Sequence, residues 1–361
     1  MRSEEVFVPI AFSADLHLTT RQRHPERYHA LEDILQKMMH HDTQTLILVG
    51  DTFDETGRNY AEFDAFCTQE GYRQIHFIVL PGNHDAGLQQ ALFTAQNIQI
   101  VEKPTVLKFA EKGLDFVLLP YAHGVSMGEA ALSVTSRVSA DRWVLVGHGD
   151  WSAGMHEPNP DEPGVYMPLT RGDIENLRPR AAILGHIHKP MDSGKVHYIG
   201  SPCGLDIRET GRRRFFILDA ESGAITPEVV DTDFLYFNES FVVLPVADEE
   251  AYVAAQIQER MAGWQLTPEE QQKVRLLSRF RGYSNNKKRL QEIVCQCLAP
   301  ICYYKDIEPD FADVAVADDS NRSEVARRIS EHVERLEMPA GEFEVRRDDV
   351  LLEALHVIYG D

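Results

Sequence analysis

Five short apolar segments in the first two-thirds of the chain are each followed by residues that commonly bind metal ions. These residues are Asp15 and His17, then Asp51 and Asp54, then Asn83 and His84, then His148, and last His186 and His188. Runs of about four to eight β-branched and apolar residues that end in Gly, Asp, Asn or His are typical of buried strands. A donor set of imidazole, carboxylate and amide oxygen favours Mn²⁺, Fe²⁺ or Zn²⁺ over Ca²⁺ or Mg²⁺. The recurrence predicts a site for divalent metal ions.

The elements around these segments predict a layered α/β fold. Residues 25–38 place Tyr28, Leu31 and Met38 at helical spacing, with Pro25 in the first turn. Strands that alternate with helices form layered sheets, and such sheets bind ligands beyond the carboxyl ends of their strands. Asp15 and His17 are two residues apart, so on an extended segment both side chains would point to the same side. His186 and His188 repeat that spacing.

Composition limits the class of protein. The chain has 361 residues, of which 43% are hydrophobic, and a formal net charge of −21. That hydrophobic fraction excludes a disordered chain, and the length favours two domains. Five cysteines fit a reducing compartment without a disulfide framework, and no apolar run is long enough to span a membrane, so we expect a cytoplasmic protein. An acidic chain attracts a polyanion only through a local site.

The pattern of strands and helices restarts after residues 231–238. A strand is expected over 241–244, a helix over 249–262, a second strand over 274–280 and a second helix over 285–298. We therefore expect a main domain at 1–236, a smaller α+β domain at 237–318 and a C-terminal helical segment at 319–361.

The order Asp-x-His, Gly-Asp-x-x-Asp, Gly-Asn-His-Asp, Gly-His, Gly-His-x-His over residues 8–206 resembles the calcineurin-like metallophosphoesterase family. The resemblance implies a layered β-sandwich core flanked by helices, with two divalent metal ions. One ion would be held by Asp15, His17, Asp51 and His188, and the other by Asp51, Asn83, His148 and His186. It also implies that His84 is the general acid and that Asp54 orients it.

Two divalent ions about 3.5–4 Å apart stabilise an in-line displacement at phosphorus. Of the seven implied ligands only Asp15 and Asp51 are anionic, so two divalent ions would leave the site with a charge of about +2. A phosphate could then be recruited locally, although the chain as a whole is acidic.

Finer matches resemble the SbcD-type branch of DNA repair nucleases. They include Gly50–Asp54, Leu80–Asp85, Leu184–Pro190 and the block Gly200-Ser201-Pro202. This resemblance implies a manganese-dependent DNA exonuclease and endonuclease in repair and recombination, with an SbcC-like coiled-coil ATPase as partner. The α+β domain would be a capping, DNA-binding domain, and the terminal helices a docking element. Asp150 departs from the branch by adding a carboxylate near His148.

Several features allow two interpretations. Arg21 and Arg23 would contact a DNA phosphate or be ordinary loop charges, and His123 would touch substrate or have no role. The basic clusters 212–214 and 287–289 indicate a solvated surface or a DNA contact. The apolar stripe of Tyr60, Phe63, Phe66 and Cys67 would pair two subunits of a homodimer or belong to the core.

Two other functions compete with the nuclease hypothesis. A small-molecule or cyclic-nucleotide phosphodiesterase or phosphatase would use the same metal site, and the net acidity of the chain favours it. A non-enzymatic scaffold on a degenerate fold would lack ligands, whereas every implied ligand and His84 are present.

Overall fold

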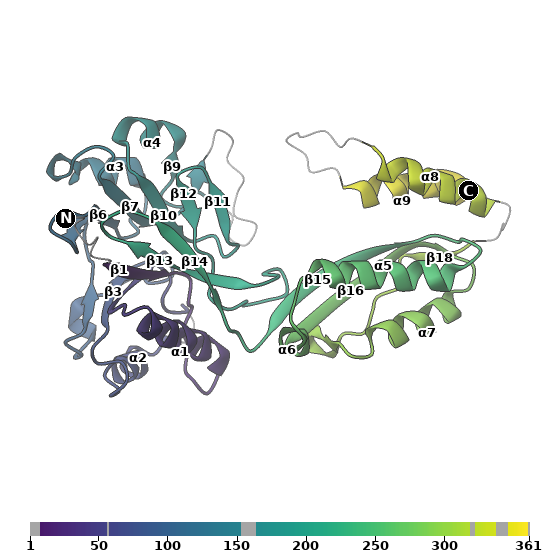
Figure 1. Ribbon diagram of the computed structural model, residues 1–361, viewed down its shortest axis with the longest axis horizontal. Helices are drawn as coiled ribbons and strands as arrows, with labels where there is room; N and C mark the ends of the chain where they lie inside the picture. Colours follow the sequence, from purple (N-terminus) through teal and green to yellow (C-terminus); the bar gives the residue numbers. More distant parts are fainter. Residues whose placement is uncertain (1–7, 56–57, 153–163, 318–321, 337–345, 360–361) are drawn as a thin grey trace, which may run out of the picture. The chain divides into compact units, whose positions relative to one another are not determined.

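The computed structural model describes residues 8–55, 58–152, 164–317, 322–336 and 346–359 (Figure 1). The chain forms two compact units. The first unit ends at residue 233 and excludes the short segment Asp206–Gly211, which belongs to the second unit with the residues from Phe234 onward. The boundary expected from the sequence, after residue 236, lies three residues further on.

Two six-stranded sheets form the first unit. The first sheet has the order β14-β13-β1-β2-β3-β4, and the second has the order β11-β12-β10-β7-β6-β5. The strands of the first sheet are β1 (Pro9–Ser13), β2 (Thr45–Val49), β3 (His76–Leu80), β4 (Ile98–Ile100), β13 (Arg213–Asp219) and β14 (Ile225–Val230). Those of the second are β5 (Thr105–Lys108), β6 (Asp115–Leu119), β7 (Trp143–His148), β10 (Ala181–Gly185), β11 (Met191–Ser193) and β12 (Val196–Tyr198).

The central strands of each sheet are parallel. In the first sheet β1 to β4 run parallel, and in the second β6, β7, β10 and β12 do. Antiparallel partners complete the sheets: β13 and β14 in the first, β5 and β11 in the second. The carboxyl ends of the parallel strands in a sheet therefore lie along one edge, which is where ligands bind in such folds.

The core of the first unit lies between the two sheets. Phe12 and Ile47 from the first sheet and Phe116, Val146 and Ile183 from the second belong to one buried cluster. Helices α1 (Pro25–His40) and α2 (Tyr60–Cys67) pack on the first sheet, and α3 (Met127–Leu132) and α4 (Arg171–Leu177) on the second. This arrangement confirms the predicted layered β-sandwich core flanked by helices. The remaining short elements are η1 (Gln90–Leu92), η2 (Thr135–Arg137), β8 (Trp151–Ser152) and β9 (Leu169–Thr170).

The apolar stripe on α2 is part of this core. Phe63 and Cys67 are completely buried and Phe66 is 1% exposed, in the same cluster as the buried face of α1. Rings at positions 53, 60, 63 and 93 pack edge to face or stacked. Of the two interpretations of the stripe, the intramolecular one is the one that the structure shows. Homodimerisation stays a prediction, without this stripe as its support.

A small α/β layer forms the second unit. Its strands are β15 (Leu235–Val243), β16 (Val274–Ser284), β17 (Cys302–Tyr303) and β18 (Val314–Val316), all paired in parallel. Helices α5 (Glu249–Gly263) and α7 (Lys287–Leu298) share a buried cluster with the sheet through Ile257, Phe280 and Leu290. The short elements are α6 (Pro268–Gln272) and η3 (Tyr304–Asp306). Strand β15 begins inside the expected boundary segment because its pairing with β16 starts at Leu235.

The C-terminal helices α8 (Ser323–Glu334) and α9 (Arg347–Tyr359) belong to the second unit. Val333, Leu351 and Leu355 form a buried cluster with Val242 and Leu244. These last two residues alternate with the β15 residues that face α5, so the helices cover the opposite face of the strand. The expected boundary at 318/319 lies outside the described residues. Within the described part of the chain, no helix combines the length and apolar character needed to cross a membrane.

Candidate metal centre

The residues singled out in the sequence follow the carboxyl ends of parallel strands from both sheets. Asp15 follows β1, Asp51 follows β2 and Asn83 follows β3, whereas His148 ends β7 and His186 follows β10. The two sheets therefore deliver their ligands to one place. Sequence spacing predicted that edge because parallel strands that end in turns place their following residues side by side.

The backbone at these strand ends is left-handed rather than extended. Asp15, His17, Asp51 and His186 have φ values of 53°, 44°, 47° and 92°. Such values are uncommon for residues other than glycine and mark functional sites when the surroundings enforce them. Two hydrogen bonds hold the Asp15–His17 segment in this conformation, from the amide of Asp15 to the carbonyl of Gly50 (3.1 Å) and from that of His17 to the carbonyl of Asp51 (2.9 Å). The expectation of an extended Asp15–His17 segment was therefore wrong.

Gly82 allows the turn after β3 to approach Asp51. A Cβ atom at Gly82 would lie 2.1 Å from Oδ1 of Asp51 and 2.3 Å from its backbone nitrogen. No side chain fits at such a distance, so glycine is required by contact rather than by conformational freedom.

The first group of donor atoms consists of Asp15, His17 and His188, whose ligand atoms lie within 4.8 Å of one another. The Nε2 atoms of His17 and His188 are 3.1 Å apart, and Nε2 of His17 is 3.9 Å from Oδ2 of Asp51. Oδ2 of Asp15 is buried and has no hydrogen-bond partner. An orphaned carboxylate oxygen facing two imidazole nitrogens fits a divalent cation, which would satisfy all of them.

The second group consists of Asp51, His148 and His186, again within 4.8 Å. Oδ1 of Asn83 lies 2.9 Å from Nε2 of His148 and 3.2 Å from Nδ1 of His186, so Asn83 joins this group. Oδ2 of Asp51 lies 3.2 Å from Nε2 of His148, and it also neighbours His17 of the first group. The seven residues thus form two adjacent sets that meet at Asp51, and they would hold two divalent ions.

Burial and mutual charge shift the titration of these groups. Burial raises the pKa of Asp15 to about 6 and lowers the pKa of His17 to about 3, so His17 is a neutral ligand at pH 7. Burial also disfavours charge on Asp51 and His148, but the electrostatic attraction between the two groups is stronger than this effect. The attraction lowers the pKa of Asp51 and raises the pKa of His148 to about 10. In the absence of metal, His148 therefore carries a proton that an ion must displace.

Asp85 is a buried residue that holds the turns of the site together, a role that was not predicted from the sequence. It is 1% exposed, and its carboxylate accepts hydrogen bonds from the backbone amides of Thr52 (3.0 Å), Phe53 (3.0 Å) and Gly82 (3.1 Å). These bonds tie the turn after β2 to the turn after β3, and so place Asp51 beside Asn83. The position of Asp85 at the end of the Gly-Asn-His-Asp block was the signal that could have identified it.

Two buried arginines were also missed. Arg27, on α1, donates to the backbone carbonyl of His17 and to Oδ2 of Asp54 (3.2 Å). Arg213, on β13, donates to the carbonyl of His188 and to both oxygens of Ser201. The cluster 212–214 is therefore not simply a solvated surface, because Arg213 is 1% exposed and Arg214 stacks over Phe216 at 4.7 Å.

His84 and Asp54, the residues implied for acid catalysis, lie at the same edge and are half-buried. The amide of His84 donates to Oδ1 of Asp51 (2.9 Å), and its ring centroid is 5.1 Å from that of His17. The carboxylate of Asp54 accepts from Arg27. The backbone thus anchors His84 directly to the ligand that both metal sets share.

The three residues considered for substrate contact lie outside the two ligand groups. Arg21 pairs with Glu32, and its amide donates to Glu62 (3.0 Å). Arg23 and His123 are exposed on loops. A hollow of about 400 Å³ beside Asn83 is lined by Tyr121, close in sequence to His123.

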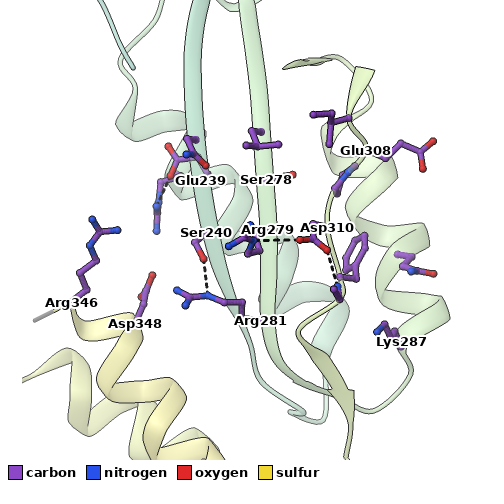
Figure 2. Close-up of a pocket in the computed structure, with 18 residues that line it drawn as sticks. Glu239, Ser240, Ser278, Arg279, Arg281, Lys287, Glu308, Asp310, Arg346 and Asp348 are labelled. Carbon is purple, nitrogen blue, oxygen red and sulfur yellow. Dashed lines mark hydrogen bonds and ion pairs between the residues drawn. The ribbon is translucent and has the colours of Figure 1, made fainter. Parts of the chain in front are cut away.

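A larger hollow, of about 960 Å³, lies within the second unit (Figure 2). In Figure 2, Arg281 points to Ser240 (3.1 Å) and Arg279 to Asp310 (3.4 Å). Its charged lining residues are Arg260, Arg279, Arg281, Lys287 and Arg346, with Glu239, Glu308, Asp310 and Asp348. Positive and negative side chains nearly balance, so this hollow has little net attraction for a polyanion.

A β-sandwich that brings candidate metal ligands together at its strand ends fits a metal-dependent phosphoesterase. Residues 8–190 match the family model described as calcineurin-like phosphoesterase, which covers half of the chain. The chain belongs to that family, as its motifs implied.

The solved structures that resemble this chain are distant. TT1561 of Thermus thermophilus is 11% identical, and the match covers 63% of this chain and 100% of that one, with a TM-score of 0.40. GAP50, the anchor in the inner membrane complex of Plasmodium, is 12% identical, with 62% and 89% covered and a TM-score of 0.39. At these values neither structure informs the function of this chain. No curated protein matches it.

Proposed function

We propose that this protein is a manganese-dependent DNA exonuclease and endonuclease that acts in the cytoplasm in DNA repair and recombination. The observation that supports its chemistry is the convergence of seven ligands from both sheets on two adjacent sets that meet at Asp51. When bound, two divalent ions would activate a water molecule and neutralise charge that develops on the phosphoryl group.

The charge of the ligand set lets an acidic chain bind a phosphodiester. Asp15 and Asp51 are the anionic ligands, and Asn83 and the histidines are neutral when they bind metal. Two divalent cations would then leave an excess of about +2. The attraction is local and does not require a basic surface.

In this proposal His84 donates a proton to the leaving oxygen. Its backbone amide is fixed to Asp51, which holds the side chain next to the ligands while leaving it half exposed at the edge of the site. An imidazolium in this position would protonate the departing alkoxide, which is the poor leaving group of a phosphodiester.

The DNA substrate is supported by the block Gly200-Ser201-Pro202, which resembles the SbcD-type nucleases. The amide of Ser201 donates to the carbonyl of His188 (3.1 Å), and Arg213 joins the same two residues. The block therefore holds the backbone of the metal ligand His188 in place. The part of the chain that resembles the nucleases is thus in direct contact with the metal site. We extend the proposal to an SbcC-like coiled-coil ATPase partner and a homodimer. Val325 and Val357, on α8 and α9, are exposed apolar residues available for docking.

The test compares substrates in the presence of Mn²⁺. Labelled duplex, hairpin and single-stranded DNA are incubated beside bis(4-nitrophenyl) phosphate and a cyclic nucleotide, with Asp51→Asn as the metal-site control. We expect DNA cleavage that depends on Mn²⁺ and on Asp51. Rapid hydrolysis of the small diesters without DNA cleavage, with or without an ATPase partner, would overturn the nuclease proposal. It would favour a small-molecule phosphodiesterase, the alternative that the net charge of −21 supports.

A further inference from the structure

Asp150 is a buried carboxylate beside the second ligand set, and it is 4% exposed. Its backbone amide donates to the carbonyl of Tyr166 (2.8 Å), and its backbone carbonyl accepts from Leu169 (2.8 Å). Its Oδ2 atom accepts from the amide of Tyr166 (2.7 Å). The residue is therefore fixed in place, and the other oxygen, Oδ1, lies 3.5 Å from Nε2 of His186.

The two ring nitrogens of His186 face different groups. Nδ1 lies 3.2 Å from the amide oxygen of Asn83, inside the ligand set, whereas Nε2 faces Asp150. The orientation of the ring is fixed from two more sides. The backbone amide of His186 donates to Oδ1 of Asp15 (3.0 Å), and the ring packs on that of Tyr166, with centroids 4.8 Å apart.

His148, in the same set, also has one ring nitrogen facing the ligands and one facing outward, but here Nε2 is the inner nitrogen and Nδ1 the outer one. Its Nε2 lies 2.9 Å from Asn83, and its outer Nδ1 lies 3.0 Å from the carbonyl of Val49. A histidine that binds a metal usually donates its other N–H to an outer acceptor, which sets the tautomer. For His148 that acceptor is a neutral carbonyl, and for His186 it is a carboxylate.

We propose that Asp150 is the positioning residue for His186. It accepts the Nε2–H of the ring and so keeps the lone pair on Nδ1, directed at the ion held by Asp51, Asn83 and His148. A carboxylate partner also makes the imidazole a stronger ligand than a carbonyl partner does. We do not count Asp150 as a ligand, because its Oδ1 faces the outer nitrogen of His186 and its Oδ2 accepts from Tyr166. This inference rests on the two-metal centre of the proposed function.

Asp150→Asn tests the tautomer directly. The amide of Tyr166 can only donate, so it keeps the Asn oxygen, and the Asn NH₂ group must turn toward His186. The NH₂ group would donate a hydrogen bond to Nε2, so the ring proton would move to Nδ1, the nitrogen that would otherwise bind the ion. We expect the affinity for one of the two ions to fall about 10- to 100-fold, with two ions still bound at saturation.

The readouts are Zn²⁺ and Mn²⁺ titrations by calorimetry, metal content, and ¹⁵N NMR of the histidine rings in the zinc-loaded protein. Asp150→Ala removes the partner without inverting the tautomer. We therefore expect a smaller loss of metal affinity than in Asp150→Asn and a larger loss of thermal stability in EDTA. Asp173→Asn is the matched control, because Asp173 also accepts a backbone amide, that of Thr170 (2.8 Å). It should leave both metal affinities unchanged.

Three results would overturn the inference. They are wild-type affinity for both ions in Asp150→Asn, an unchanged proton position on His186, or the loss of one ion at saturation in both variants, which would make Asp150 a ligand. A wild-type protein that binds fewer than two ions would instead contradict the two-metal proposal, so the two failures are distinguishable.

Discussion

Arg213 donates a hydrogen bond from its buried guanidinium to the backbone carbonyl of His188. Arg27 makes the corresponding bond to the carbonyl of His17. The Nε2 atoms of these two histidines lie 3.1 Å apart. The facing ligands of the first metal set are thus each held through the main chain by a buried cation, independently of any metal ion.

Replacing Arg213 by Met should destabilise the metal-free protein. The carbonyls of His188 and Ser201 and the hydroxyl of Ser201 would lose a buried donor, and unsatisfied buried groups are costly. We expect a loss of about 3 kcal/mol or more in the free energy of unfolding, measured with urea in EDTA. The control is Arg208→Ala, which removes an exposed pair with Asp206 and should change stability by less than about 0.5 kcal/mol. Equal small losses in both variants would contradict the assigned role.

His84→Ser should separate proton donation from metal binding. If His84 protonates the leaving group, kcat should fall about 10²- to 10⁴-fold for alkyl phosphodiesters and much less for nitrophenyl esters, which leave without a proton. Metal content should stay at the wild-type level, since the backbone amide that contacts Asp51 remains. Steady-state kinetics with a series of leaving groups, together with elemental analysis, checks both points. Loss of both ions would show that the histidine is a ligand instead.

Metal binding should release protons and strengthen as the pH rises. The pKa of His148 is raised to about 10, so this ring is protonated at neutral pH and must lose that proton to bind an ion. The apparent affinity of the second set should therefore rise about tenfold per pH unit between about pH 6 and pH 8. Below about pH 6, protonation of Asp15 should weaken the first set as well. Calorimetry in two buffers with different heats of ionisation counts the protons released on metal binding. A metal affinity that does not depend on pH would contradict the predicted proton release.

Gly82→Ala should weaken metal binding by both sets. The new Cβ would meet Asp51 at 2.1–2.3 Å and push apart the turns after β2 and β3. We expect the affinity for metal to fall at least about 100-fold, because both sets share Asp51. Gly71→Ala is the matched control, since its Cβ would have no neighbour within 4 Å. Calorimetric titration measures the metal affinity of both variants. A Gly82→Ala protein with normal metal affinity would disprove the close contact.

Local patterns in the chain predicted layered α/β sheets with metal-binding residue types at the strand ends, whereas the β-sandwich core and the two ligand sets were implied by the resemblance to the family. Each ligand block follows an apolar run, and parallel strands bring such ends together within one sheet. The pairing of Asp51 with His148, 97 positions apart and in the other sheet, came from the resemblance. The left-handed backbone of Asp15 and His17 could not be predicted, because it depends on hydrogen bonds to the turn after β2.

Residues that support the ligands were harder to predict because their partners are backbone groups far away in the chain. Arg213 stands among three consecutive arginines, which suggested an exposed cluster. The alternation of β13 instead turns Arg213 inward and places Arg214 on the other face. Asp150 was noticed as an added carboxylate near His148, but its Oδ1 lies 3.5 Å from Nε2 of His186.

His17 and His188 are 171 positions apart, and each follows a strand of a different sheet. Neither sheet alone can assemble the centre. A nascent chain that has not yet released β10 from the ribosome would lack His186 and His188, so neither set of ligands would be complete. Hydrolytic activity would therefore arise only after both sheets of the first unit have folded together, and it would not have to wait for the second unit.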